Sequence, residues 1–426
     1  MKKTDYKIHI IGAGVSGLIA AQVLENHGYH PTIIEASSSV GGRVKSDIVD
    51  NYILDHGFQV LLTSYPAAKH YLNYTDLELQ EFLPGATIFK EGKQQTIGDP
   101  LRSFSLLFPT LFASIGTFAD KTKILKLNAL LKKKKVIEIF KAEEKTTLDY
   151  LQDFGFSEAI INDFFKPFFS GIFLEPNLET SSRMFEFVYK MFGDGLAVLP
   201  KGGIQEIPNQ LKSKLKNTTF IFDSPVKEVK DTEIILQNND SFTSDMTIIA
   251  TEASSLIANL KNQETEWKSC DTFYFETHKK VINKPLIGLI ADEKALINNI
   301  FYHTSVATTS KGAKELLSVT VVKAHNLSKL DLILKVTEDL KAFCNIDAVN
   351  LLKHYHIKRA LPKLNSLQYE ISSTETKLKP TVFLAGDQLL NGSLNAAMIA
   401  GERAAIGVVQ TLEDGLIVDE LTSEYS

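Results

Sequence analysis

The chain has 426 residues, a length that exceeds one compact core and predicts two domains. Hydrophobic residues make up 44% of it, as in ordinary globular proteins, and the net charge of -5 gives no sign of a nucleic-acid partner. The two cysteines, Cys270 and Cys344, form no CxxC pair, which argues against a disulfide framework, a cysteine-rich zinc site and a dithiol redox centre. We expect no metal site. Because only a short apolar run precedes the first glycines, we also expect no signal peptide and a cytoplasmic location.

The first predicted elements form a βαβ unit. Residues 6–11 are apolar and β-branched, as in a buried strand, and a GxGxxG sequence follows at residues 12–17. A helical pattern continues to His27, and Gly28 is a good helix stop. Residues 31–35, with the sequence PTIIE, are the second predicted strand.

The spacing of these glycines is typical of a dinucleotide site. Gly12 allows a tight turn, Gly14 lets the backbone approach a pyrophosphate, and Gly17 lets the helix pack closely on the strand. The start of the helix, with Val15 and Ser16, offers unpaired N–H groups to the phosphates. We therefore expect a dinucleotide to bind here.

Glu35 ends the second predicted strand, where a carboxylate accepts hydrogen bonds from ribose hydroxyls. Its charge disfavours a 2′-phosphate, so FAD or NAD is expected rather than NADP. A βαβ turn that only packs, without a ligand, is the alternative. No second GxGxxG and no CxxC is present, which argues against a two-dinucleotide disulfide reductase.

The next stretch, residues 37–43 with the sequence SSSVGGR, helps to decide between FAD and NAD. Together with GxGxxGLxAA and a strand ending in glutamate, it resembles the flavin-containing amine oxidase superfamily, which includes amine oxidases, protoporphyrinogen oxidases and phytoene-desaturase-like enzymes. The resemblance implies FAD as the cofactor, with Ala36, Gly41 and Gly42 beside it and Arg43 near its pyrophosphate. A surface position for Arg43 is the alternative.

In the segment LDHGFQVL, the resemblance places His56 and Gly57 near the flavin. His56 is the candidate for contact with substrate or cofactor, and an incidental histidine beside a glycine turn is the alternative. No other catalytic side chain is assigned, because hydride transfer to a flavin requires no acid–base pair.

The C-terminal part carries a second match. Residues 381–385 are a predicted buried strand, and residues 394–405 are a predicted helix rich in small residues. The resemblance implies that Gly386 and Asp387 approach the ribityl chain and phosphate. It also implies that the helix N-terminus, at Ser393 and Leu394, points at the flavin ring, where it would stabilise negative charge.

These matches predict an α/β fold with a Rossmann-like, mostly parallel FAD-binding domain made from both ends and the middle of the chain. Residues 199–251 resemble the part of that domain in which the backbone near Val226 meets the adenine. We assign residues 1–75, 199–260 and 356–426 to this domain. Residues 76–198 and 261–355 are assigned to an interleaved α+β substrate domain, with an antiparallel sheet as its floor and a helical cap.

The predicted cap holds helix-spaced phenylalanines that either line a hydrophobic cavity or form ordinary core; core is the favoured interpretation. They are Phe164, Phe165, Phe168, Phe169, Phe173, Phe185 and Phe187.

An apolar run at residues 104–118 is too short to span a bilayer, and residues 121–145 hold nine lysines and three glutamates. Residues 104–145 therefore suggest peripheral contact with an anionic membrane, with a solvated helix as the alternative. We make no prediction of oligomeric state.

The expected function is an FAD-dependent oxidoreductase that removes a hydride from a hydrophobic or cyclic substrate, polyene-like or porphyrinogen-like. The resemblance would also allow amine oxidation. Against it, the strand CDTFYF at residues 270–275 holds no lysine, and Ser393 stands where amine oxidases place an aromatic residue. A redox-neutral flavin isomerase remains an alternative. So does a non-catalytic binding protein similar to GDP-dissociation inhibitors, although such a protein has no need for Glu35 and Arg43.

Overall fold

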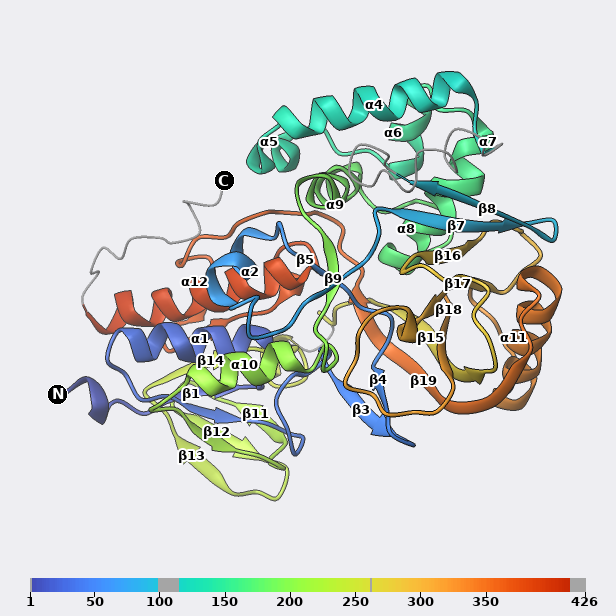
Figure 1. Cartoon of the computed structure of the whole chain (residues 1–426). Coiled ribbons are helices and arrows are strands. Elements are labelled where there is room, and N and C mark those ends of the chain that lie inside the picture. Colours follow the sequence, from blue (N-terminus) through green and yellow to red (C-terminus); the bar gives the residue numbers. More distant parts are fainter. Residues whose placement is uncertain (1, 99–114, 261–262, 414–426) are drawn as a thin grey trace.

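The computed structural model describes residues 2–98, 115–260 and 263–413. Two β-sheets, each covered by its own helices, meet along the middle of the molecule, and a group of helices lies over the second sheet (Figure 1). Most of the apolar run predicted at residues 104–118 lies outside the described residues. In the described part of the chain, no helix combines the length and apolarity that a membrane crossing requires.

The first sheet has six strands in the order β10-β2-β1-β14-β21-β20. Five are parallel, and only the edge strand β20 is antiparallel. All residues of the central strands β1 and β14 are buried, as expected for a parallel sheet covered on both faces. The strands are β1 (Ile8–Ile11), β2 (Thr32–Ile34), β10 (Thr219–Ile221), β14 (Met246–Ile249), β20 (Lys377–Lys379) and β21 (Val382–Leu384).

One face of this sheet is covered by helices α1 (Val15–Asn26), α10 (Glu206–Lys214) and α12 (Leu394–Leu412) (Figure 1). The other face packs against a three-stranded antiparallel unit of β11 (Val226–Val229), β12 (Glu233–Leu236) and β13 (Ser241–Thr243). The predicted first strand, helix and second strand are thus present as β1, α1 and β2, within one or two residues of their expected ends.

The second sheet has seven strands in the order β19-β15-β18-β17-β16-β7-β8. All its pairings are antiparallel except β16 with β7. Helix α11 (Lys329–Cys344) covers one face through a core of its own. The strands are β7 (Gly85–Lys90), β8 (Lys93–Gly98), β15 (Trp267–Thr277), β16 (Ile287–Ile290), β17 (Ile297–Tyr302), β18 (Glu315–Val321) and β19 (Ala348–Pro362). The predicted fold class is confirmed. The division into domains stays a prediction, and β19 runs through the boundary placed at residue 356.

The helical cap lies over the other face of this sheet (Figure 1). Its elements are α4 (Phe118–Lys133), α5 (Val136–Lys141), α6 (Thr147–Asp153), α7 (Glu158–Ile160), η3 (Ile161–Phe165), α8 (Lys166–Phe173) and α9 (Ser182–Asp194). Thr117 caps α4, because its hydroxyl accepts a hydrogen bond from the backbone N–H of Asp120.

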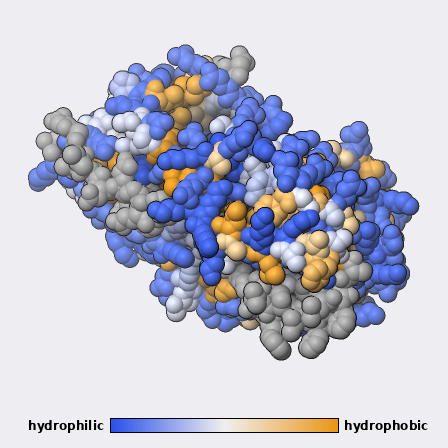
Figure 2. Space-filling view, turned by 90° about the horizontal axis from the view of Figure 1, so that it is seen from above, coloured by the Kyte–Doolittle hydropathy of each residue, from blue (hydrophilic) through white to orange (hydrophobic). Residues whose placement is uncertain are grey.

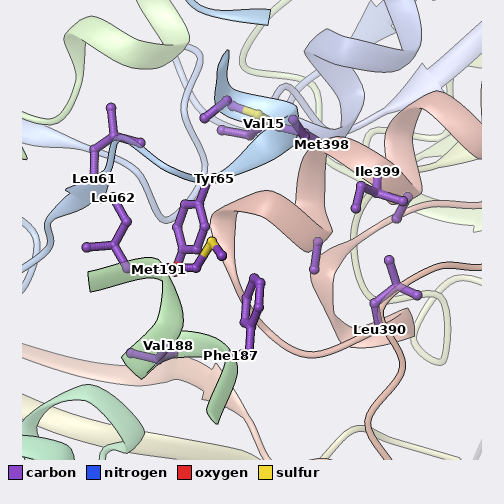
Figure 3. Close-up of a cluster of buried hydrophobic side chains, with 14 of the residues drawn as sticks. Val15, Leu61, Leu62, Tyr65, Phe187, Val188, Met191, Leu390, Met398 and Ile399 are labelled. Atoms are coloured by element: carbon purple, nitrogen blue, oxygen red, sulfur yellow. The ribbon is translucent and has the colours of Figure 1, made fainter. Parts of the chain in front are cut away.

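Helix α9 joins the cap to the first sheet. Its Phe187 ring stacks on Tyr65 at 5.8 Å between centroids, and Figure 3 shows the Met191 side chain beside both residues. Short elements connect the layers: α2 (Pro66–Tyr71), the hairpin β3 (Ser46–Val49) and β4 (Tyr52–Asp55), and a small sheet of β5 (Leu61–Leu62), β9 (Ala197–Leu199) and β6 (Gln80–Glu81). Four 3-10 turns complete the described elements: η1 (Lys3–Asp5), η4 (Ala258–Leu260), η5 (His303–Ser305) and η6 (Asp387–Leu389).

Candidate functional site

A cavity of about 2190 Å³ runs from the first sheet to the space between the second sheet and the cap. Most of the residues predicted to hold the cofactor line it, although they come from opposite ends of the chain. Gly17, Ala36 and Val226 do not line it. The predicted residues in its walls are Gly12, Gly14, Val15, Ser16, Glu35, Gly41, Gly42, Arg43, His56, Gly57, Gly386, Asp387, Ser393 and Leu394.

Two glycine turns form one end of the cavity. Gly12 has a φ of +102°, a conformation that favours glycine, and a side chain at Gly17 would place its Cβ 2.1 Å from the Gly12 carbonyl oxygen. Gly14 is different, because no heavy atom lies within 4 Å of the place its Cβ would take. Gly14 also forms a parallel bridge with Gly41. The two turns therefore leave bare backbone facing open space, which suits a pyrophosphate.

The Glu35 carboxylate lies at the carboxyl end of β2, next to the first turn. Its Oε2 accepts a hydrogen bond from the Ala13 N–H at 2.7 Å, and its Oε1 accepts from the Ser37 N–H and hydroxyl, both at 2.8 Å. Each carboxylate oxygen has two lone pairs, so one acceptor site, on Oε2, remains for a ribose hydroxyl. Glu35 thus stabilises the turn as well as facing the cavity, a second role that the sequence did not indicate.

Arg43 and Asp387, 344 residues apart in sequence, form an ion pair across the cavity. The Asp387 side chain is 5% exposed, whereas that of Arg43 is 40% exposed. The Arg43 guanidinium carbon also lies 5.1 Å from the centre of the Trp267 ring. The sequence predicted both charged residues at the cofactor but did not predict this pair, and it gave no signal for Trp267.

The N-termini of α1 and α12 meet at the same end of the cavity. Gly401 of α12 lies so close to α1 that an added Cβ would be 2.2 Å from the Ser16 carbonyl oxygen. The Ser16 hydroxyl donates to the Ala397 carbonyl at 2.7 Å. Ser393 caps α12 by accepting from the Ala396 N–H at 3.0 Å. Both helices therefore present their N-terminal ends, where anionic groups are stabilised, to one space.

The comparisons with known proteins agree with this geometry. The family described as flavin containing amine oxidoreductase matches residues 15–409. The chain belongs to this family. Its cofactor is FAD, and the bare Gly14 backbone, the free acceptor site on Oε2 of Glu35 and the two helix N-termini fit that cofactor.

Curated relatives match a short part of this chain in sequence, whereas solved structures match nearly its whole length in fold. An L-amino-acid oxidase of Sistrurus catenatus edwardsii is 40% identical over 76 residues, which is 18% of this chain and only 15% of the oxidase. An oxidoreductase structure from Methanosarcina mazei matches with a TM-score of 0.72 at 16% identity, covering 93% of this chain and 99% of that one. A fatty acid isomerase structure from P. acnes matches with a TM-score of 0.69 at 14% identity, covering 95% and 99%. At these identities the two structures show the fold alone.

The far end of the cavity is apolar. Of the predicted phenylalanines, Phe164, Phe168, Phe169 and Phe173 line it. The other three, Phe165, Phe185 and Phe187, are fully buried away from it. The expectation of plain core therefore holds for only part of the group.

Lys268 also lines the cavity, at the start of β15. Its Nζ donates to the Phe173 carbonyl at 3.0 Å and to the Thr180 hydroxyl at 2.9 Å. Burial lowers its pKa, although the nearby carboxylates of Glu175 and Glu179 act in the opposite direction. From the sequence, Lys268 was given no role, because it flanks the CDTFYF segment and does not lie within it.

Proposed function

We propose that this protein is an FAD-dependent oxidoreductase that removes a hydride from a hydrophobic or cyclic organic substrate, polyene-like or porphyrinogen-like. The observation that carries the proposal is the single cavity that connects the glycine turns to the phenylalanine-lined end. When bound, the flavin supplies the two-electron acceptor. The chain supplies binding through the turns and Glu35, and a helix N-terminus at Ser393 for the charge that accumulates beside it.

The apolar end supports a substrate with few polar groups. Phe168, Phe169 and Phe173 line it together with the buried pair Asn299 and Thr320, whose side chains are hydrogen-bonded to each other at 3.3 Å. Amine oxidation is the less favoured alternative because Ser393, before α12, is an aliphatic hydroxyl that caps the helix and offers no aromatic wall. A binding protein without catalysis is also less favoured, since Glu35, Arg43 and Asp387 are all present at the cavity.

A redox-neutral flavin isomerase is the second candidate. The observation that favours it is the similarity to the P. acnes fatty acid isomerase structure, which covers 95% of this chain. An isomerase would need the same cofactor turns and an equally apolar cavity, so the two functions differ only in whether electrons leave the protein after each turnover.

We further propose that the cavity opens toward an anionic membrane. Helix α4 lines its rim, and Phe118 and Leu125 of that rim are 81% and 55% exposed. Residues 121–145, which include most of α4, hold nine lysines. Figure 2, seen from the cap side, shows hydrophobic surface among the hydrophilic side chains of this face.

Liposome binding tests this surface. Wild-type protein should sediment with anionic vesicles at low salt, and Phe118→Ser with Leu125→Ser should weaken that binding. The matched control is Leu330→Ser with Leu334→Ser, which changes two exposed leucines of α11 on the other side of the second sheet. Equal binding by both double variants, or no binding by the wild type, would contradict the membrane contact.

The substrate is tested by anaerobic bleaching of the flavin with a panel of carotenoid precursors, porphyrinogens, unsaturated fatty acids and amines. We expect bleaching by a neutral lipophile of the first two classes. Bleaching by amines alone would overturn the proposal in favour of amine oxidation. Conversion of an unsaturated lipid with no external electron acceptor would establish the isomerase.

A further inference from the structure

His56 is held in the cavity wall by residues from two other strands. It follows β4, and its Nε2 lies 2.9 Å from Oδ2 of Asp47 on β3. The hydroxyl of Tyr355, on β19, donates to the same Oδ2 at 2.8 Å. The rings of His56 and Tyr355 face each other at 4.5 Å between centroids, tilted by 35°. This arrangement fixes the orientation of the imidazole.

The chemistry of Asp47 sets the hydrogen positions on His56. Partial burial raises the pKa of Asp47, but hydrogen bonds from Tyr355 and His56 outweigh it and hold that pKa below its ordinary value. Burial and the Asp47 carboxylate raise the pKa of Tyr355, so it stays a phenol. An ionised carboxylate only accepts hydrogen bonds, so Nε2 of His56 is the nitrogen that donates to Asp47, and Nδ1 is the nitrogen at which the neutral ring can accept a proton. Within residues 2–98, 115–260 and 263–413, no group is hydrogen-bonded to that Nδ1.

The other charged groups around this cluster are few. Lys353 acts on Asp47 and lies 5.6 Å from the Tyr355 ring centre. Asp55, at the end of β4, is buried, and its charge interacts with His56. The Gln59 amide donates to the backbone carbonyls of His56 and Arg43 at 2.9 Å each, whereas the Arg43 guanidinium contacts Asp387 and the Trp267 ring. The three side chains Asp47, His56 and Tyr355 are called the relay below.

We propose that the relay is a proton-transfer site, in which His56 accepts a proton at Nδ1 from the cavity and Asp47 stabilises the resulting imidazolium. The inference rests on the proposed function. Converting a CH–CH unit to a C=C bond breaks two C–H bonds: one hydrogen leaves as hydride, with its electron pair, to the flavin, and the other leaves as a proton. His56 takes that proton and releases it to solvent, which the Asp47 side chain reaches because it is 36% exposed.

The experiment uses the FAD-loaded protein and needs no substrate. The potential of the bound flavin is measured from pH 5 to 9 by equilibration with a reference dye, which reports the protons taken up per flavin reduced. Negative charge gained on reduction favours the protonated His56, so the wild type should show an inflection that His56→Gln lacks. Glutamine still donates a hydrogen bond to Asp47 but does not titrate in this range. His303→Gln is the matched control, because His303 is partly buried, hydrogen-bonded to Ser318, and does not line the cavity.

Retention of the wild-type inflection by FAD-loaded His56→Gln would overturn the proposal. If that variant loses FAD, Asp47→Asn gives the same test: without the carboxylate the inflection should move to lower pH, and an unmoved inflection also overturns the proposal. With a substrate in hand, bleaching should slow about 100-fold in His56→Gln with KM unchanged. A wild type that no substrate bleaches would defeat the proposed function while leaving the potential measurement intact.

Discussion

The two ends of the cavity are built in different ways. At the cofactor end, backbone meets backbone, and the decisive positions have no side chain: an added Cβ at Gly17 or Gly401 would lie 2.1 or 2.2 Å from a carbonyl oxygen. At the substrate end, large side chains such as Phe168, Phe169 and Phe173 form the wall. The cofactor end thus depends on close approach of the main chain, and the substrate end depends on side-chain volume, which changes more freely without breaking the fold.

The largest effect expected from this difference is at Gly17. Gly17→Ala should lower the free energy of unfolding by about 3 kcal/mol, because its Cβ collides with the Gly12 carbonyl. Gly14→Ala should leave the stability of the apoprotein near that of the wild type and reduce FAD affinity, since only open space surrounds its Cβ. Urea unfolding and FAD titration separate the two results.

The matched control for both variants is Gly193→Ala, in the cap helix α9, where an added Cβ meets nothing within 4 Å. This change should raise stability by up to about 1 kcal/mol through helix propensity. If Gly17→Ala were as stable as Gly193→Ala, the close approach of Gly17 to the Gly12 carbonyl would not be what requires a glycine at position 17.

A smaller effect is expected at Glu35. Glu35→Ala should weaken FAD binding by about 1–3 kcal/mol, the range for removing one partner of a charged hydrogen bond. It should also lower the stability of the apoprotein, because the carboxylate accepts hydrogen bonds from Ala13 and Ser37. Full flavin occupancy at limiting FAD would show that Glu35 has no contact with the ribose.

The substrate end should respond in the opposite way. Phe169→Leu removes part of a buried ring from the cavity wall and should cost about 1 kcal/mol of stability while leaving FAD affinity unchanged. Differential scanning calorimetry and FAD titration give the two quantities. A loss of FAD affinity comparable to that of Glu35→Ala would mean that the two ends are not separable.

The smallest effect concerns pH. Burial raises the pKa of Asp55 to about 6, so the folded protein binds a proton more tightly than the unfolded chain and is stabilised as pH falls from about 6 toward 4. Burial lowers the pKa of His303, in the turn η5 directly after β17, to about 4, so stability is lost as pH falls from about 6.5 toward 4. Asp55 and His303 therefore change the free energy of unfolding in opposite directions over the same pH range.

Asp55→Asn removes the contribution of Asp55 to the pH dependence of stability. Between pH 7 and pH 5 the variant should lose on the order of 1 kcal/mol more stability than the wild type, measured by urea unfolding at both pH values. Its Asn oxygen still accepts from Ser46 and Ile204, the partners of the carboxylate. Identical pH profiles of variant and wild type would contradict the assigned role of Asp55.

The same contrast explains what the sequence revealed. Gly12, Gly14, Gly17 and Glu35 lie within one βαβ unit, so local spacing was enough to predict their arrangement. The relay could not be predicted from the sequence, because Tyr355 lies 308 residues from Asp47 and only the pairing of distant strands brings the two together. Periodicity also could not separate Phe169, in the cavity wall, from Phe165, in the core, because both lie on a buried side of consecutive turns.

The most direct test asks whether both ends of the chain bind one flavin. Trp267 is the sole tryptophan and lies against Arg43, so its fluorescence reports on the site as apoprotein is titrated with FAD. If both ends bind one flavin, the fluorescence should be quenched and the quenching should saturate at one FAD per chain. Binding should also be weaker in Arg43→Ala and in Asp387→Asn, and the double variant should lose less than the sum of the two because the residues share one ion pair. Fluorescence that does not change, in a protein that stays colourless in excess FAD, would contradict the binding of one flavin by both ends of the chain.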